Sequence, residues 1–410
     1  MAVIVEPYIP RTITVHLGAP NESAENVTVS FSDYVKNVAS SEIFPTWDTA
    51  AIRANVLAII SFALNRVYTE FYTSRGYDFQ ITSTTAYDQK FIRGRNFFDS
   101  VSQVVDEIFD DYIRRQGSVE PLAAKFCNGT TTTCDGLSQW GSQELAQAGY
   151  NSIDILRNYY GDDIEIVTNA PIQDLRQSYP GAPLRLGSAG PEVAVVQASL
   201  NRIAQNYPAI PKISRVTGVF GEETQRAVRK FQQIFNLNPD GVVGKATWYE
   251  LVYLYVAVTR LAELLSEGQE YYNVRFQFPG EELQQGIRGG EVRVLQYMLA
   301  ILAEFNPEIP PLTVDGDFGA ATAQAVRDYQ RLMGMEVTGR VNERTWESIY
   351  SNFVRAELAL RRDNVRFPEN FVTAAGSQNS GAEQQKTRLG QYPGRELKLG
   401  QTDRSGGTQV

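Results

Sequence analysis

Two regions of the chain repeat one pattern of apolar and polar positions. Residues 184–256 contain VVQASLNRI, VTGVFGEETQRAVRKFQ and PDGVVGKATW, and residues 285–355 contain VLQYMLAIL, VDGDFGAATAQAVRDYQ and VTGRVNERTW. From Gly218 and its counterpart Gly316 onward, the two copies keep a constant offset of 98 positions. The repeat indicates two small modules of one design, and doubled modules more often strengthen the hold on a repetitive ligand than add a second chemistry.

The spacing inside each copy predicts an apolar helix with a central Gln, a turn, and a second helix. Apolar residues recur at helical intervals after Thr224 in one copy and after Thr322 in the other, so both threonines lie where a helix begins. Gly218 and Gly316 precede these helices and suit turns that need a positive φ.

This order of elements resembles the bacterial peptidoglycan-binding domain of three-helix type. The resemblance rests on Gly-x-Phe-Gly-x-x-Thr, then Phe/Tyr-Gln, then Thr-Trp, a long motif that is present twice. It implies that peptidoglycan is the partner of the protein. Trp248 and Trp346 are expected in the module cores rather than against sugar rings, because a module of about 70 residues has little core and its largest aromatic is usually structural.

The N-terminal region has a different pattern. Residues 48–67 are apolar on all sides of a helix that Asp48 would cap, so this helix should be buried at the centre of a domain. A shorter amphipathic helix precedes it and ends near Glu42, at a junction where a side chain can face a cleft. His16 lies in the alternating segment ITVHLG, which predicts a strand.

Composition narrows the class of protein. With 410 residues, of which 43% are hydrophobic, the chain can bury about three domain cores. A net charge of −9 argues against nucleic acid or an anionic membrane as the partner. The longest apolar run, residues 56–64, is much shorter than the roughly 20 residues of a membrane span. The N-terminus MAVIVEPYIPRT has no basic region, so no signal peptide is expected.

A second resemblance covers both ends of residues 31–166. DYVKNVASSEIFPTWDTAAIRANVLAIISFALNR and CDGLSQWGSQELAQAGYNSIDILRNYYGDDIEI are similar to two motifs of the SpoIID/LytB family. The resemblance implies lytic transglycosylase activity and places the family's catalytic glutamate on Glu42. Joined to two peptidoglycan-binding domains, such a domain resembles the spore cortex-lytic enzymes.

One carboxyl group is enough for lytic transglycosylation. It protonates the glycosidic oxygen and then takes a proton from the muramic C6 hydroxyl, provided that an apolar setting raises its pKa. Glu42 has Val38, Ile43, Phe44 and Trp47 near it in the sequence, which is such a setting. The alternative is that Glu42 caps or ion-pairs a helix end, and the family resemblance favours the catalytic role.

The other candidate site residues are polar or aromatic. Ser138, Gln139 and Trp140 match the family's Ser-Gln loop and are predicted to bind substrate, although a tight turn with Trp140 in the core is an equal alternative. Thr85 and Gln89 resemble polar residues that line the family's cleft. Asp33, Asp48 and Asp88 are the remaining candidate acids, and no motif supports them.

No metal or other cofactor is predicted. The family commonly has a His-Gly before its Ser-Gln motif, whereas this chain has Cys134 and Asp135 there and a single histidine, His16. Cys127 and Cys134 could hold zinc, form a disulfide or labile thiol pair, or pack as free thiols. A structural zinc site needs four ligands, of which two are missing locally. We therefore expect activity to survive chelators.

The predicted fold is α+β, with a SpoIID-like N-terminal domain followed by two small three-helix peptidoglycan-binding domains. The predicted boundaries are 1–170 for the catalytic domain, 171–183 for a linker, 184–256 and 285–355 for the two binding domains, 257–284 for a helical strut and connector, and 356–410 for a tail. The tail has almost nothing to bury, which predicts disorder.

These observations lead to a functional hypothesis: a lytic transglycosylase that cleaves spore cortex peptidoglycan. Deposition on the forespore from the mother-cell cytoplasm would explain the missing signal peptide. Two alternatives belong to other classes. One is a non-catalytic wall-binding scaffold, and the other is a wall-binding component of a phage or injection machine.

Overall fold

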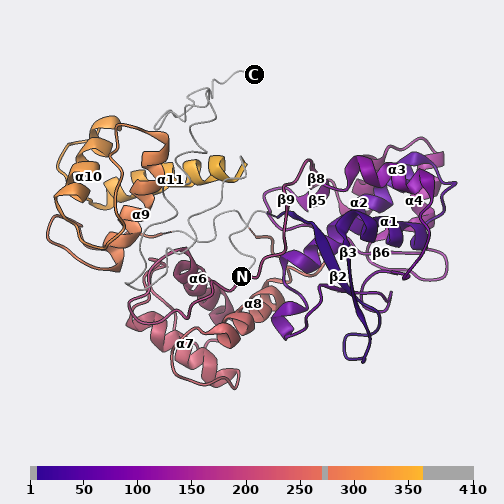
Figure 1. Cartoon of the computed structure of the whole chain (residues 1–410), viewed down its shortest axis with the longest axis horizontal. Coiled ribbons are helices and arrows are strands. Elements are labelled where there is room, and N and C mark those ends of the chain that lie inside the picture. Colours follow the sequence, from indigo (N-terminus) through magenta and orange to yellow (C-terminus); the bar gives the residue numbers. More distant parts are fainter. Residues whose placement is uncertain (1–6, 270–275, 363–410) are drawn as a thin grey trace. The chain divides into compact units, whose positions relative to one another are not determined.

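The computed structural model of the chain describes residues 7–269 and 276–362, with side chains described up to residue 356. The chain divides into two compact units (Figure 1). The first consists of Met1–Pro180 and Lys245–Asn273, and the second of Gly181–Gly244 and Val274–Val410. We describe each unit by itself.

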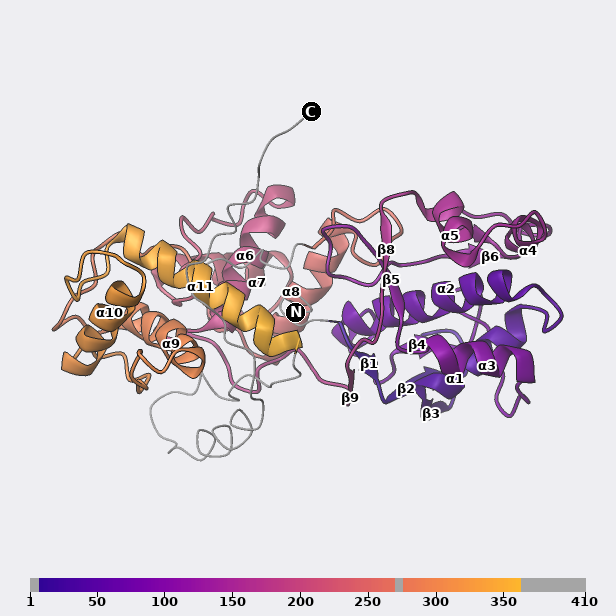
Figure 2. The same ribbon diagram turned by 90° about the horizontal axis from the view of Figure 1, so that it is seen from above.

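The first unit is built around one long helix, α2 (Thr49–Tyr68). Its apolar residues occupy all faces, so it is stable only where other elements cover it on every side. Figure 2 shows α2 with helices packed on opposite sides. These helices are α1 (Phe31–Glu42), α3 (Asp99–Ile108), α4 (Gln139–Gln147) and α5 (Ser152–Tyr160). The predicted central buried helix is therefore confirmed.

Within the described residues, one segment, Thr49–Arg75, has the length and composition of a membrane span. Its most apolar window is 83% buried in the fold, and the core helix of a folded domain meets the same criteria.

Short strands complete this unit and make it α+β. They form four small sheets: β1 (Ile9–Pro10) with β9 (Ile172–Gln173), β2 (Thr12–His16) between β3 (Asn26–Ser30) and β4 (Ile81–Thr82), β5 (Tyr112–Arg115) with β8 (Ile164–Val167), and β6 (Phe126–Cys127) with β7 (Leu137–Ser138). β2 runs antiparallel to β3 and parallel to β4. His16 ends β2, where its Nδ1 lies 2.7 Å from Asn26 Oδ1 and its ring stacks on Phe79, so it is the sheet residue that the sequence predicts.

The chain returns to the first unit through α8 (Lys245–Thr259). The sequence predicts that this helix continues to Glu267 as a strut, and that prediction is wrong. The helix ends at Thr259, because Arg260 takes a left-handed conformation with φ of 58°. Residues 261–269 then continue without helix.

Buried polar side chains hold this returning segment. The Glu120 carboxylate accepts hydrogen bonds from Ser266 Oγ and from the Gln269 backbone N–H, both at 2.8 Å. Asn65 Nδ2 on α2 donates to the Leu261 carbonyl at 2.8 Å. Irregular backbone can be buried only where such partners satisfy it. These bonds make residues 261–269 part of the first unit.

The second unit contains most of the sequence repeat. Its helices are α6 (Pro191–Asn206) and α7 (Glu222–Ile234) from the first copy, and α9 (Gly290–Phe305), α10 (Ala320–Leu332) and α11 (Glu343–Arg362) from the second. The same two antiparallel bridges occur in each copy: Leu184–Val243 and Ala189–Val219 in one, Leu283–Val341 and Arg288–Asp317 in the other. The repeat in sequence is thus a repeat in structure.

A buried glutamine organises the turn in each copy. Gln296 Nε2 donates to the Asp317 carbonyl and to Thr322 Oγ1, both at 3.0 Å, while its Oε1 accepts the Gly316 N–H at 2.8 Å. Gln197 makes the equivalent bonds to Val219, Thr224 and Gly218. Gly316 has a φ of 82°, which explains why glycine occupies this turn.

We expect Gln296→Leu to lower the free energy of unfolding of the second unit by about 2–4 kcal/mol, because it leaves the Gly316 N–H and two acceptors buried without partners. Urea unfolding followed by circular dichroism measures this loss. Gln324→Leu is the matched control, since Gln324 is exposed on α10 and its loss should cost less than about 0.5 kcal/mol. Equal midpoints for the two variants would contradict the organising role.

The two repeat tryptophans are core residues, as predicted. Trp346 is buried, and its Nε1 donates to the Phe276 carbonyl at 2.8 Å within the second unit. Trp248 is buried on α8, and its Nε1 donates to Ser178 Oγ at 2.9 Å within the first unit. Neither indole N–H is available to a sugar.

Parts of both copies pack together inside the second unit. A Cβ added at Gly290 would lie 2.7 Å from Val219 Cγ1, and one added at Gly218 would lie 2.7 Å from the Phe276 ring. Gln277 also exchanges hydrogen bonds with the Val216 backbone. These contacts show that residues 276–277 complete the packing of the first copy as well as the second.

The predicted C-terminal tail begins too early. α11 extends to Arg362, so residues 356–362 are helical rather than part of a tail. Residues 363–410 lie outside the described residues.

Candidate active site

Glu42 is the last residue of α1 and is half-buried. Ser30 caps the start of the helix, and its hydroxyl accepts the Asp33 N–H at 3.1 Å. Two segments far away in sequence meet the Glu42 carboxylate: the Lys90 backbone N–H donates to Oε1 at 3.0 Å, and Gln139 Nε2 donates to Oε2 at 3.3 Å. Each carboxylate oxygen therefore has a neutral donor.

Burial raises the pKa of Glu42 above its usual value. The hydrogen bonds from Lys90 and Gln139 favour the ionised form and offset part of this rise. A carboxyl group with a raised pKa and donors on both oxygens can hold a proton and then stabilise the carboxylate that remains after the proton leaves. These are the properties of a general acid that later acts as a base.

Gln139 is positioned by the start of α4. Ser138 caps this helix, and its Oγ accepts the Gly141 N–H at 3.0 Å. The Trp140 N–H donates to the Asn128 carbonyl at 3.2 Å, within the loop that the disulfide Cys127–Cys134 closes. The disulfide decides among the three alternatives that the sequence leaves open for the cysteines, and it lies beside the segment that presents Gln139 to Glu42.

Three aromatic side chains cluster beside this acid in the first unit. The rings of Phe44 and Trp47 lie 5.7 Å apart, and Trp140 lies 5.5 Å from Phe44 and 5.2 Å from Trp47. Trp47 is buried, whereas Phe44 is 52% exposed and Trp140 37% exposed. Exposed large aromatics supported by a buried one form a surface on which a pyranose ring can stack. Of the two sequence alternatives for Trp140, the structure favours the exposed one.

The loop after β4 contacts the candidate site through a different residue from the one that the sequence predicts. Gln89 is buried, its Oε1 accepts the Tyr34 hydroxyl at 2.8 Å, and its Nε2 donates to the Ile59 carbonyl at 3.2 Å. This amide is engaged inside the core, so the structure does not support Gln89 as a substrate ligand. Its neighbour Lys90 reaches the site instead, through backbone N–H. Thr85 is exposed in the same loop.

The remaining candidate acids have other roles. Asp88 has a fully buried side chain that accepts from Arg66 Nε at 2.8 Å, Tyr72 OH at 2.6 Å and the Thr82 N–H at 2.9 Å. This network joins α2 to β4 and is structural. Asp48 accepts from Gln143 Nε2 at 2.7 Å, and Asp33 is exposed in the first turn of α1.

In the part of the chain that the structure describes, no group of three or more His, Cys, Asp or Glu side chains could hold a metal ion. Both cysteines are joined in the disulfide, and His16 is engaged by Asn26.

Comparison with known families identifies the repeated modules. Residues 189–251 and 288–349 match the peptidoglycan binding domain family. The chain thus carries two peptidoglycan-binding domains, which confirms this part of the sequence analysis. The resemblance of residues 31–166 to the SpoIID/LytB family stays a prediction.

Two curated proteins are similar to parts of the chain. The chain is 27% identical over 205 residues to a protein named N-acetylmuramoyl-L-alanine amidase CwlM from Mycobacterium tuberculosis (strain ATCC 25618 / H37Rv), a match that covers 49% of this chain and 45% of that protein. It is 53% identical over 38 residues to an uncharacterized protein in the bpoA1 3′ region of Kitasatospora aureofaciens, covering 9% of this chain and 32% of that one. The chain spans less than half the length of these relatives.

Proposed function

We propose that the protein is a peptidoglycan-lytic enzyme, a lytic transglycosylase whose acid and base is Glu42. The observation that carries the proposal is the setting of Glu42: a half-buried carboxyl group with a raised pKa, a donor on each oxygen, and exposed aromatic rings beside it. The two peptidoglycan-binding domains supply the substrate class.

The proposed reaction uses one proton twice. Protonated Glu42 donates to the oxygen between N-acetylmuramic acid and N-acetylglucosamine, and the bond from the muramic C1 to that oxygen breaks. The Lys90 N–H and the Gln139 amide stabilise the resulting carboxylate. Glu42 then takes the proton of the muramic C6 hydroxyl as O6 bonds to C1, which forms the 1,6-anhydro ring and restores the acid. No second carboxylate is needed to activate water.

Phe44 and Trp140 would hold the glycan strand. Their exposed faces suit stacking against sugar rings, and buried Trp47 supports both of them. Ser138 fixes the helix start that carries Gln139 and Trp140, so its role in this proposal is positioning.

The amidase named among the relatives supports a second candidate: hydrolysis of the bond between N-acetylmuramic acid and L-alanine. Digestion of purified sacculi, followed by mass spectrometry, separates the candidates by their products. A lytic transglycosylase releases anhydro-muropeptides, an amidase releases stem peptides from intact glycan, and a non-catalytic scaffold releases neither. Parallel digestion of spore cortex and vegetative sacculi tests the proposed location in the spore.

A substitution next to Glu42 should move the pH dependence of cleavage. Gln139→Leu removes a hydrogen bond that favours ionised Glu42, so the Glu42 pKa rises further and the acid stays protonated to higher pH. The alkaline limb of the pH profile of kcat/KM should shift to higher pH by about 0.5–1 unit. An unchanged limb, or a shift to lower pH, would contradict the assignment of the limb to Glu42.

A further inference from the structure

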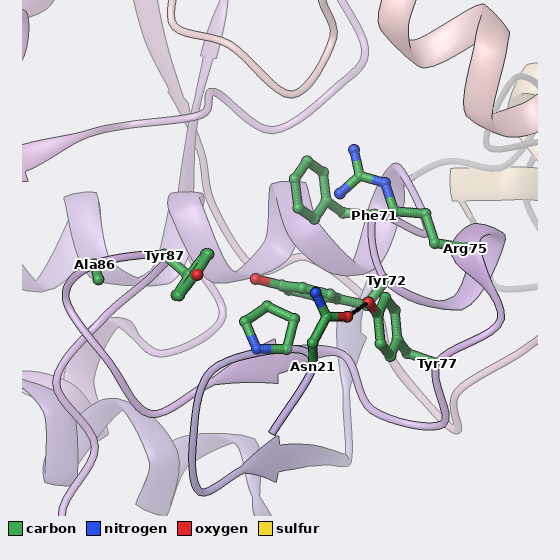
Figure 3. Close-up of a pocket in the computed structure, with 8 residues that line it drawn as sticks. Asn21, Phe71, Tyr72, Arg75, Tyr77, Ala86 and Tyr87 are labelled. Atoms are coloured by element: carbon green, nitrogen blue, oxygen red, sulfur yellow. Dashed lines mark hydrogen bonds between the residues drawn. The ribbon is translucent and has the colours of Figure 1, made fainter. Parts of the chain in front are cut away.

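A pocket of about 330 Å³ lies in the first unit, and none of the candidate site residues lines it (Figure 3). Its wall comes from three segments: the loop before β3, the chain just after α2 including the short 3-10 helix η2 (Thr73–Arg75), and the loop after β4. This volume matches the lower end of the range for small-molecule sites, which is roughly 300–1,000 Å³.

Three polar groups on this wall, from Asn21, Arg75 and Tyr87, have donors that are not used within the described part of the protein. Tyr72 and Tyr77 use their hydroxyl hydrogens internally, because Tyr72 donates to Asp88 and Tyr77 donates to Asn21 Oδ1. Among the described residues, no hydrogen-bond or ion-pair partner occurs for the Arg75 guanidinium, the Asn21 amide NH₂ or the Tyr87 hydroxyl. A pocket that presents unused N–H and O–H groups suits a ligand rich in acceptors.

Arg75 is the one charged residue among the eight that line the pocket. Its guanidinium stacks 3.9 Å from the centre of the Phe71 ring and 5.0 Å from that of Tyr253, which orients the side chain and leaves its N–H edge for a ligand. Asp88, which follows Tyr87 in the sequence, is paired with Arg66. In a chain of net charge −9, an unpaired and stacked arginine indicates a site for an anion.

Tyr87 provides the surface for the rest of the ligand. Its side chain is 52% exposed, and in Figure 3 it stands across the pocket from Arg75. Phe71 cannot serve in this way, because Arg66 and Arg75 each lie 3.9 Å from the centre of its ring. The pocket thus combines one cation for a carboxylate with one exposed ring for a pyranose.

We propose that this pocket binds a carboxylate-bearing unit of peptidoglycan, with Arg75 on the carboxylate and Tyr87 against the adjoining group. Two parts of peptidoglycan can carry such a carboxylate: the lactyl group of a muramic acid residue that bears no stem peptide, and the stem peptide itself. The choice of ligand rests on the two peptidoglycan-binding domains and not on the chemistry of Glu42.

The test is a binding titration of the full chain, monitored by ligand-observed NMR. It uses three probes: N-acetylmuramic acid, N-acetylglucosamine and L-alanyl-D-isoglutamine. Arg75→Gln removes the cation, and Arg157→Gln is the matched control, because Arg157 is exposed on α5 in the same unit. We expect the wild-type protein to bind N-acetylmuramic acid at least about tenfold more tightly than N-acetylglucosamine. Arg75→Gln should abolish that difference, and Arg157→Gln should preserve it.

The other probe and one further variant identify the source of the carboxylate. If the dipeptide binds in an Arg75-dependent way and N-acetylmuramic acid does not, the ligand of the pocket is the stem peptide. Tyr87→Ala should weaken the binding of N-acetylmuramic acid and leave the binding of the dipeptide unchanged. The proposal is overturned if neither N-acetylmuramic acid nor the dipeptide binds in an Arg75-dependent way. It is also overturned if Arg157→Gln has the same effect on binding as Arg75→Gln. The pocket is judged by the Arg75-dependent part of binding and the catalytic proposal by cleavage, so failure of the pocket and failure of the catalytic proposal are separate results.

Discussion

Glu42→Gln should lower the release of anhydro-muropeptides from sacculi by about 10² or more. Glutamine keeps the shape of the side chain, but it cannot give a proton to the glycosidic oxygen or take one from the C6 hydroxyl. The measurement is the initial rate of product release, quantified by mass spectrometry, at a pH below the raised pKa of Glu42. Wall binding should be unchanged, because the peptidoglycan-binding domains are untouched.

The same acid-to-amide change elsewhere on α1 provides the control. Asp33 is exposed at the opposite end of this helix, so Asp33→Asn should leave both the rate and the melting temperature unchanged. If Glu42→Gln retained the wild-type rate, the catalytic assignment would be wrong. If both variants slowed release equally, the effect would come from the charge of the helix and not from proton transfer.

Sequence alone predicted the features that local pattern determines. The repeat placed Thr224 and Thr322 at the buried starts of α7 and α10, where they accept hydrogen bonds from the paired glutamines. It also placed both tryptophans in cores, because a small module has few other residues large enough to fill it. The apolar surface of α2 predicted its burial for the same reason: no exposed helix could keep that composition.

Features that depend on distant segments could not be predicted in this way. The Lys90 N–H donates to Glu42 from 48 positions away in the sequence, and the Gln139 amide donates to it from 97 positions away. Gln89 and Lys90 are adjacent, yet one is in the core and the other at the acid, because successive residues of an extended loop point in different directions. The return of residues 261–269 to Glu120 is equally non-local, and the helical period of that segment gave a misleading signal.

The second peptidoglycan-binding domain should raise the affinity for sacculi far more than it raises the rate on short glycans. Two linked modules bind a polymer with many equivalent sites, and the second contact is intramolecular, so avidity can exceed that of one module by about 10² or more. The sequence alone suggests a truncation that removes residues 276–410. The structure places Phe276 and Gln277 against Gly218 and Val216 of the first copy, so a cut after Pro279 leaves that copy better packed.

Removal of residues 280–410 should therefore weaken sacculus pull-down by about 10² or more, while cleavage of short soluble glycans, which need only the first unit, should change little. Circular dichroism of the truncated chain establishes that α6 and α7 remain folded, and Gln296→Leu in the full chain provides a milder second variant that loosens the same domain without deleting it. Unchanged pull-down would show that one module is enough. Loss of short-glycan cleavage by a folded truncated chain would show that the second unit forms part of the catalytic groove, and the binding domains could then not be simple tethers.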